Sequence, residues 1–198
     1  MSGPAVAATL TSWAELASAM SSCTACALAD SRQRVVPGQF PPGARVLLVG
    51  EAPGREEDAG GQPFVGRSGQ LLDRLLAEVG GDRAALAVVN TVKCRPPANR
   101  TPRRAESVTC RPWLDRQVDV VDPAVVVTLG TSALAWALGP GHRLRDVRGP
   151  APVDGPAGRP LVATYHPAAA LRFGPAGEPM AALRADLALA VGLARELA

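Results

Sequence analysis

Short apolar runs alternate along this chain with stretches in which apolar residues recur at helical spacing. Apolar runs of about four to eight residues between glycine, proline or polar residues are typical of buried strands, and a period of about 3.6 residues is typical of helices. A segment rich in glycine and proline, 139–160, is predicted to be a loop or a loose hairpin. We predict strands at 44–50, 86–92, 123–130 and 159–167, and helices at 11–22, 68–81, 101–121, 131–138 and 180–198.

Side chains at the ends of these segments predict how several of the helices begin. Small polar residues favour the N-cap position because their oxygens accept hydrogen bonds from the first free backbone N–H groups. We expect Thr11 or Ser12 to cap the first helix, Ser68 the second and Thr101 the third. Pro112 lies inside the third helix and is expected to kink or split it.

The order of the elements predicts the fold class. Near-continuous apolar strands that alternate with helices indicate a parallel sheet covered by helices on both faces. Ligands of such sheets bind outside the carboxyl ends of the strands. Glu51 follows the first strand, Asn90 lies near the end of the second and His166 follows the fourth, whereas the third ends in Leu-Gly-Thr and offers less chemistry. Three polar side chains are therefore expected to converge on one pocket.

The length and composition indicate the number of domains and the cellular compartment. With 198 residues, 47% of them hydrophobic, the chain is expected to form a single domain over 1–198. The net charge of +3 is slight, and nearly all cations are arginine, Lys93 being the only lysine. Arginine suits phosphate contacts, but a codon bias towards arginine is the simpler explanation. No secretory signal and no membrane-spanning run is visible, so we expect a cytosolic monomer.

The stretch GEAPGREEDAGGQPFVGRSGQLLD (50–73) follows the first strand and contains six glycines and two prolines. It lacks the Lys-Ser/Thr pair of a Walker loop and the spacing of the dinucleotide-binding pattern, which disfavours a phosphate-dependent enzyme. Only His142 and His166 are present, so a histidine-rich metal site is excluded. We interpret the stretch as a tight loop that walls a small pocket.

The four cysteines predict a metal centre. Cys23 and Cys26 form a C-x2-C pair, whereas Cys94 and Cys110 are separated by 15 residues. Cys94 lies just past a strand, where burial in the core is not expected, and four thiols in a reducing compartment suggest metal ligands. Zinc sites commonly show two close pairs. One close pair favours a four-iron, four-sulfur cluster, with zinc or free thiols as the alternatives.

A series of motifs in the same order resembles the family 4 uracil-DNA glycosylases, the iron–sulfur type. The motifs cover most of the chain, from Cys23 to about Arg172, and read G-E-A-P-G-x-x-E-D, G-x-P-F-V-G-x-x-G-x-L-L, N-x-V-K-C-R-P-P, C-R-P-W-L and Y-H-P-A-A-A-L-R. The resemblance implies a three-layer α/β fold with a central four-stranded parallel sheet flanked by helices. It also implies a structural [4Fe-4S] cluster on the four cysteines, tying 23–26 to 94–110.

The activity implied by this resemblance is hydrolysis of the N-glycosidic bond of deoxyuridine in DNA, which releases uracil and leaves an abasic site. Such an enzyme takes the base out of the stack before cleavage. The family places Asn90 against the hydrogen-bonding edge of uracil and Phe64 against its ring. Glu57 corresponds to the position that blocks the methyl group of thymine, and the backbone around Ala52 supplies further donors.

Catalysis is expected to depend on Glu51 and His166. Glu51 would orient or deprotonate the attacking water and favour the cationic sugar. His166 would donate to the uracil carbonyl, where negative charge develops. A related family holds DNA covalently through a histidine in an insertion after the second strand, and KCRPPANRTPRR has no histidine. We therefore predict hydrolytic turnover.

Contacts with DNA are predicted at three further positions. Ser68 lies where helix N–H groups would meet a phosphate, and Leu171 and Arg172 lie where related enzymes enter the duplex. A basic run is expected either to touch phosphates or to form a solvated face, namely Arg95, Arg100, Arg103 and Arg104. The alternative to an enzyme is a non-catalytic iron–sulfur DNA-binding module of the same fold, although a dead pocket would more often have lost Glu51, Asn90 or His166.

Overall fold

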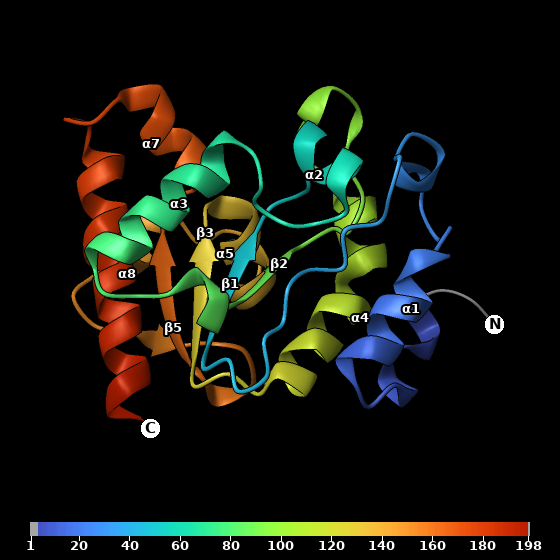
Figure 1. Ribbon diagram of the computed structural model, residues 1–198, viewed down its shortest axis with the longest axis horizontal. Coiled ribbons are helices and arrows are strands. Elements are labelled where there is room, and N and C mark those ends of the chain that lie inside the picture. Colours follow the sequence, from blue (N-terminus) through green and yellow to red (C-terminus); the bar gives the residue numbers. More distant parts are fainter. Residues whose placement is uncertain (1–3, 198) are drawn as a thin grey trace.

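The computed structural model describes residues 4–197 and contains one five-stranded sheet with the strand order β2-β1-β3-β5-β4 (Figure 1). Four strands run parallel, which confirms the predicted parallel sheet, and β4 pairs with β5 antiparallel. The additional strand has only two residues and forms a short hairpin arm within 139–160. The strands are β1 Val46–Gly50, β2 Ala87–Asn90, β3 Val125–Leu129, β4 Val153–Asp154 and β5 Pro160–Thr164.

Helices cover both faces of the sheet, so the fold has the three layers predicted (Figure 1). The α-helices are α1 Trp13–Ser21, α2 Arg55–Gly60, α3 Arg67–Glu78, α4 Arg104–Val121, α5 Thr131–Leu138, α6 Leu144–Val147, α7 Pro167–Phe173 and α8 Glu178–Glu196. Short 3-10 helices are η1 Pro4–Thr9, η2 Ala27–Asp30, η3 Arg83–Ala85, η4 Pro97–Asn99 and η5 Pro156–Gly158. Residues 1–3 and 198, which the predicted single domain included, lie outside the described part of the chain.

Two apolar cores lie on the two faces of the sheet because successive strand side chains point to opposite sides. Leu48 of β1 packs with α3 and α8 in one core. Leu47 and Val49, its neighbours, pack with α4 and α5 in the other. Every residue of β1 is buried, which explains why its sequence shows no alternation of apolar and polar residues.

The helix starts differ in part from the predictions. Ser12 caps α1, one of the two residues expected. The N-cap of α3 is Gly66, one residue before the helix, and Ser68 lies inside the first turn. The N-cap of α4 is Arg103, so the prediction of Thr101 was also wrong. At both sites a buried glutamate accepts a hydrogen bond from the backbone N–H of the cap residue, and the cap residue itself is neither serine nor threonine.

Pro112 does not interrupt α4, which is continuous from Arg104 to Val121. A proline removes the hydrogen bond to the carbonyl four residues earlier, here that of Val108. Both residues lie on the exposed side of the helix, where water can satisfy that carbonyl, so the helix tolerates the proline. Within residues 4–197, no helix has the length and apolar character needed to span a bilayer.

Candidate active site

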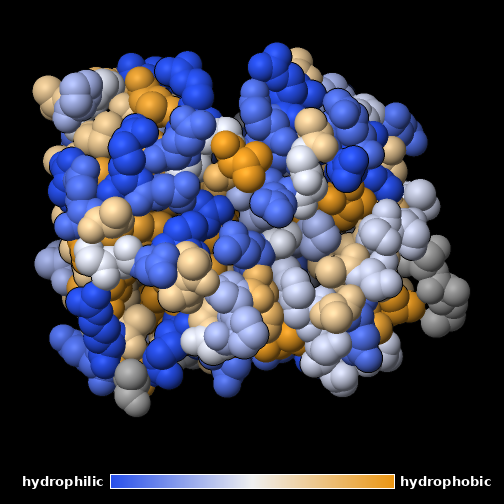
Figure 2. Space-filling model, in the orientation of Figure 1, coloured by the Kyte–Doolittle hydropathy of each residue, from blue (hydrophilic) through white to orange (hydrophobic). Residues whose placement is uncertain are grey.

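The carboxyl ends of the parallel strands open into a cavity of about 630 Å³. Figure 2 shows the molecule hollowed at its upper edge, between the side of α3 and α7 and the side of α2. The end of each parallel strand contributes to the wall, since β1, β2, β3 and β5 are neighbours in the sheet. The predicted site residues that line the cavity are Glu51, Ala52, Glu57, Phe64, Ser68, Asn90, His166 and Arg172.

The Asn90 side chain is buried, with 2% of its surface exposed, and contacts this cavity. Its Oδ1 atom has no hydrogen-bond partner among residues 4–197. An unpartnered buried amide oxygen is unfavourable unless a ligand or water completes it. The backbone of Asn90 is held from the other side, because Lys93 Nζ donates to its carbonyl at 2.6 Å. Asn90 thus places an amide group with unused hydrogen-bonding capacity in the wall of the cavity.

Phe64 lies against the same cavity in a strained backbone conformation. Its φ is +54°, a region that bulky residues rarely occupy and that costs about 1–3 kcal/mol. Helix α3 holds it there, because Gly69 packs so closely that a Cβ would lie 1.6 Å from the Phe64 carbonyl oxygen. Strain of this kind persists where the surrounding structure over-determines it, often at functional sites.

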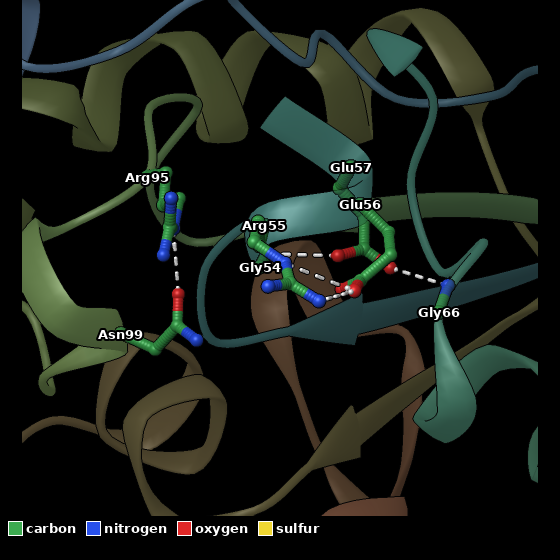
Figure 3. A network of polar contacts seen from close by, with 7 residues as sticks. All are labelled: Gly54, Arg55, Glu56, Glu57, Gly66, Arg95 and Asn99. Carbon is green, nitrogen blue, oxygen red and sulfur yellow. Dashed lines mark hydrogen bonds and ion pairs between the residues drawn. The ribbon is translucent and has the colours of Figure 1, made fainter. Parts of the chain in front are cut away.

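Glu57 braces the two loops that form the cavity wall (Figure 3). Its carboxylate accepts hydrogen bonds from the backbone N–H groups of Gly54 at 3.0 Å, Val65 at 2.9 Å and Gly66 at 2.9 Å. The side chain is buried and lines the cavity, so it stands at the predicted wall. Its carboxylate contacts also show that it braces the Phe64 loop.

His166 caps α7 and points its ring at the cavity. Its Nδ1 accepts a hydrogen bond from the Ala168 N–H at 3.2 Å, so the neutral ring carries its hydrogen on Nε2. Burial lowers the pKa of His166 from 6.5 to about 4, although the Glu57 carboxylate opposes this shift. The ring centroids of His166 and Phe64 lie 5.8 Å apart. At neutral pH the residue is therefore an uncharged N–H donor beside an aromatic platform.

Glu51 is tied to the end of the third strand, which the sequence had left without a role. Ser132, in the first turn of α5, donates from Oγ to Glu51 Oε2 at 2.5 Å. The carbonyl of Glu51 accepts from Thr91 Oγ1 at 2.6 Å and from the Val92 N–H at 3.3 Å. The signal in the sequence was a hydroxyl residue, Ser132, two positions after Gly130, the glycine that follows β3.

Gly130 forms the turn between β3 and α5 beside His166. Its φ is +88°, and a Cβ there would lie 3.1 Å from the Cβ of His166. Glycine adopts this conformation without steric strain and leaves room for the histidine. The end of β3 therefore shapes the site although it carries no charged residue.

The segment after His166 carries Leu171, for which a contact with the duplex stays a prediction. Leu171 is partly buried and packs against the core formed with α3 and α8. The exposed apolar side chain at this end of α7 is Phe173, with 64% of its surface accessible. Arg172 is exposed and lines the cavity, and Ser68 lies in the first turn of α3 at the cavity wall.

The predicted basic run separates into bound and exposed arginines. Arg100 forms two hydrogen bonds to the buried Glu106, at 2.9 and 2.7 Å, and this side chain is therefore engaged within the fold. Arg95 donates to Asn99 Oδ1 at 2.7 Å (Figure 3). The remaining two arginines of the run, Arg103 and Arg104, are exposed to solvent.

The four cysteines surround a second, smaller cavity between the N-terminal segment and α4. Cys94 and Cys110 are each 8% exposed, so the expectation that Cys94 would escape burial was wrong. The segment that carries the C-x2-C pair covers them, a long-range contact that the local sequence does not show. The cavity is lined by Cys23, Cys26, Cys94 and Cys110 together with Arg32 and Lys93.

Burial controls the charges around this cysteine cavity. It raises the pKa of the Cys94 thiol to about 12 and raises that of Cys110. It lowers the pKa of Lys93 to about 8, and negative charge on Cys110 or Cys94 would oppose this shift. Arg32 donates to Cys94 Sγ at 3.5 Å. In the part of the chain that the structure describes, no three or more His, Cys, Asp or Glu side chains form a site for a single metal ion.

Comparison with protein families agrees with this fold. The family model described as the uracil DNA glycosylase superfamily matches residues 37–188, more than half of the chain. The matched range includes the cavity and two of the four cysteines, Cys94 and Cys110. The chain therefore belongs to the uracil DNA glycosylase superfamily.

Curated relatives refine this assignment. The type-4 uracil-DNA glycosylase of Thermotoga maritima is 44% identical over 151 residues, which cover 76% of this chain and 78% of the relative. That of Sulfurisphaera tokodaii is 42% identical over 157 residues, covering 76% and 71%. The type-5 uracil-DNA glycosylase of Thermus thermophilus is 36% identical over 151 residues, covering 67% and 68%. Within the superfamily, the chain groups with the type-4 enzymes, as its motifs predicted.

Proposed function

We propose that this protein hydrolyses the N-glycosidic bond of deoxyuridine in DNA, releasing uracil and leaving an abasic site for repair. The observation that carries the proposal is the buried Asn90 amide, which lines the cavity and whose Oδ1 atom has no hydrogen-bond partner among residues 4–197. The names of the type-4 relatives support the same activity. Each step of the proposed reaction is assigned to residues of the cavity.

Recognition of the base rests on Asn90 and Phe64. A carboxamide offers one acceptor and one donor group side by side, which matches the adjacent N–H and carbonyl on the edge of uracil. Extrusion of the base from the stack is required first and is least unfavourable in single strands or mismatches. The Phe64 ring then provides a face on which the flipped base stacks. Glu57 supports this arrangement by holding the Phe64 loop.

Departure of the base rests on His166. Cleavage sends the electron pair of the C1′–N1 bond to uracil, so negative charge develops on its carbonyl oxygen. The neutral His166 ring, with Nδ1 occupied by Ala168, directs its Nε2–H as a donor to that oxygen. A preorganised donor in a site shielded from water stabilises such charge more than solvent does. Backbone amides near Ala52 add to the same effect.

Attack at the sugar rests on Glu51. Its carboxylate orients a water molecule towards C1′, accepts the proton of that water and favours the positive charge on the sugar. One oxygen of the carboxylate is held by Ser132, which leaves the other for water. We further propose that Ser68, Arg172 and Phe173 hold the DNA, through a phosphate at the start of α3 and an apolar contact with the bases.

The cysteine cavity fits a [4Fe-4S] cluster, which we propose as a structural group. Lys93 is buried, with 2% of the residue exposed, and the hydrogen bond of its ammonium group goes to a neutral carbonyl. An isolated buried ammonium is unfavourable, and four thiolates on a cluster would supply the missing negative charge. A cluster needs thiolates further apart than the tight shell of a zinc ion, which agrees with the spread of the cysteines around a cavity. The group would supply sulfur–iron bonds that join 23–26 to 94–110.

Incubation with matched oligonucleotides tests the activity. Uracil-containing and thymine-containing strands of the same sequence are treated with the protein, and both alkali-labile sites and free uracil are measured. We expect cleavable sites and uracil from the first strand alone, and a large loss with Glu51→Gln. Binding of the uracil strand without release of uracil would contradict the proposal and favour the non-catalytic DNA-binding module.

A further inference from the structure

We propose that Ser132 is a positioning residue for the reaction, because it holds the Glu51 carboxylate in the orientation that water attack requires. The inference rests on the proposed function and adds a residue to it. Neither the motifs of the sequence nor the charged residues of the cavity point to Ser132. The contact between the two side chains joins residues that lie 81 positions apart in the chain.

The sheet brings these two residues together. β1 and β3 are hydrogen-bonded neighbours with Val49 opposite Thr128. Glu51 follows the end of β1, and Ser132 follows the end of β3 after the turn at Gly130. Both side chains are therefore presented at the same edge, and Ser132 Oγ lies 2.5 Å from Glu51 Oε2.

The surroundings of Glu51 leave its orientation to this one contact. Thr91 and Val92 hold the carbonyl of Glu51, so its backbone is fixed. Its carboxylate is partly buried, and within residues 4–197 Ser132 is its only side-chain hydrogen-bond donor. Without that donor the side chain would populate several rotamers. The second carboxylate oxygen would then no longer be held at one place in the cavity.

A capping role does not account for Ser132. The N-cap of α5 is Gly130, and no side chain caps that helix. Ser132 lies within the first turn, and its hydroxyl is directed to Glu51 and away from the helix backbone. A residue that mattered only for the helix would change the melting temperature. A residue that orients a catalytic carboxylate changes the rate of the chemical step.

Two variants of nearly equal shape separate these roles. Ser132→Thr keeps the hydroxyl and Ser132→Val replaces it with a methyl group, so any cost of the added bulk is common to both. We expect Ser132→Val to lower kcat for uracil release by about 10- to 100-fold, with KM changed by less than about threefold, because Glu51 acts on the bond and does not read the base. Ser132→Thr should retain most of the wild-type kcat. Ser18→Ala, at an exposed serine of α1, is the matched control.

A double-mutant cycle with Glu51→Ala tests whether Ser132 acts through Glu51. Rates are measured under single-turnover conditions on a uracil-containing strand. We expect Ser132→Val to have no further effect once Glu51→Ala is present, since the contact is already absent. Equal losses in both backgrounds would overturn the inference, as would a wild-type kcat in Ser132→Val. If the wild-type protein releases no uracil, the proposed function fails and this inference fails with it. If only the Ser132 series is unaffected, the inference alone fails.

Discussion

The carboxamide of Asn90 and the ring of Phe64 meet across Gly50, where an added Cβ would lie 2.4 Å from Asn90 Oδ1 and 2.6 Å from Phe64 Cζ. Neither distance is tolerated by a real carbon atom. Asn90 comes from the end of β2 and Phe64 from the loop before α3, so the glycine at the end of β1 lets two separate elements close on one space. The predicted reader of the base and its stacking platform are thereby placed in one wall.

This contact predicts the effect of Gly50→Ala. The methyl group must displace the Asn90 amide or the Phe64 ring, so uracil release should fall by at least about 10²-fold, a loss typical of a misplaced site. The rate is measured on a uracil-containing strand, with the melting temperature as a check on folding. Gly60→Ala is the control, since a Cβ at that position meets no atom within 4 Å apart from its chain neighbours and the backbone of its own helix. Equal rates for both variants would contradict the role given to Gly50.

Asn90→Ala should slow uracil release by at least about 10²-fold, because the cavity loses both groups that pair with the base. It should also weaken inhibition by free uracil, which occupies the pocket without DNA. The inhibition constant of free uracil is measured beside the rate for wild type and variant. Unchanged inhibition in Asn90→Ala would show that another residue reads the base.

His166 should remain a neutral ring throughout the pH range in which the protein works. Its pKa is lowered from 6.5 to about 4, so the ring stays uncharged until the pH falls to about 4. Nitrogen NMR of a labelled sample should show hydrogen on Nε2 at pH 7, with His142→Ala used to assign the two histidines. A ring that gains a proton near pH 6.5 would contradict this environment.

The same shift predicts a loss of stability in acid. Between pH 6.5 and about 4 the unfolded chain binds a proton at His166 that the folded protein does not bind. The contribution of this residue to the free energy of unfolding therefore falls as the pH falls through that window. His166→Gln should reduce that part of the pH dependence, measured by urea unfolding at several pH values. An unchanged slope would place the cause elsewhere.

A [4Fe-4S] cluster at the four cysteines would make the protein coloured. A protein with a four-iron cluster should be brown with a broad absorbance near about 400 nm, which Cys94→Ala should abolish. A chelator should leave uracil release intact until the cluster is lost, because the group is proposed to be structural. A colourless protein with one equivalent of zinc would refute the cluster.

Phe173 should matter more for duplex than for single-stranded DNA. Its exposed ring lies at the end of α7, one residue after the cavity-lining Arg172. We expect the ring to fill the space that an extruded base leaves in a duplex. Phe173→Ala should therefore lower activity on duplex DNA by about tenfold, and on single strands by less. Val108→Ala, at another exposed apolar residue with 61% of its surface accessible, is the control.

Much of the fold and part of the site could be predicted from local patterns. Every parallel strand was expected close to its observed position, because buried runs such as that of β1 differ from their surroundings within a few residues. The rule that ligands bind at the carboxyl ends of parallel strands placed Glu51, Asn90 and His166 at one edge. The short helices α2, α6 and α7 were missed, because four to seven residues show too little periodicity.

Contacts between residues far apart in the chain could not be predicted in this way. The bond from Ser132 to Glu51, the cover over Cys94 and the packing of Leu171 against the core each depend on how separate elements meet. The spacing of apolar residues in a segment shows which face of that segment is buried. It does not show which polar group from a distant part of the chain will pack against it. Residue types and their order were enough for the layers and the location of the cavity, whereas the partners of Glu51 and Glu57 follow from the three-dimensional packing of the chain, since hydrogen bonds form between neighbours in space.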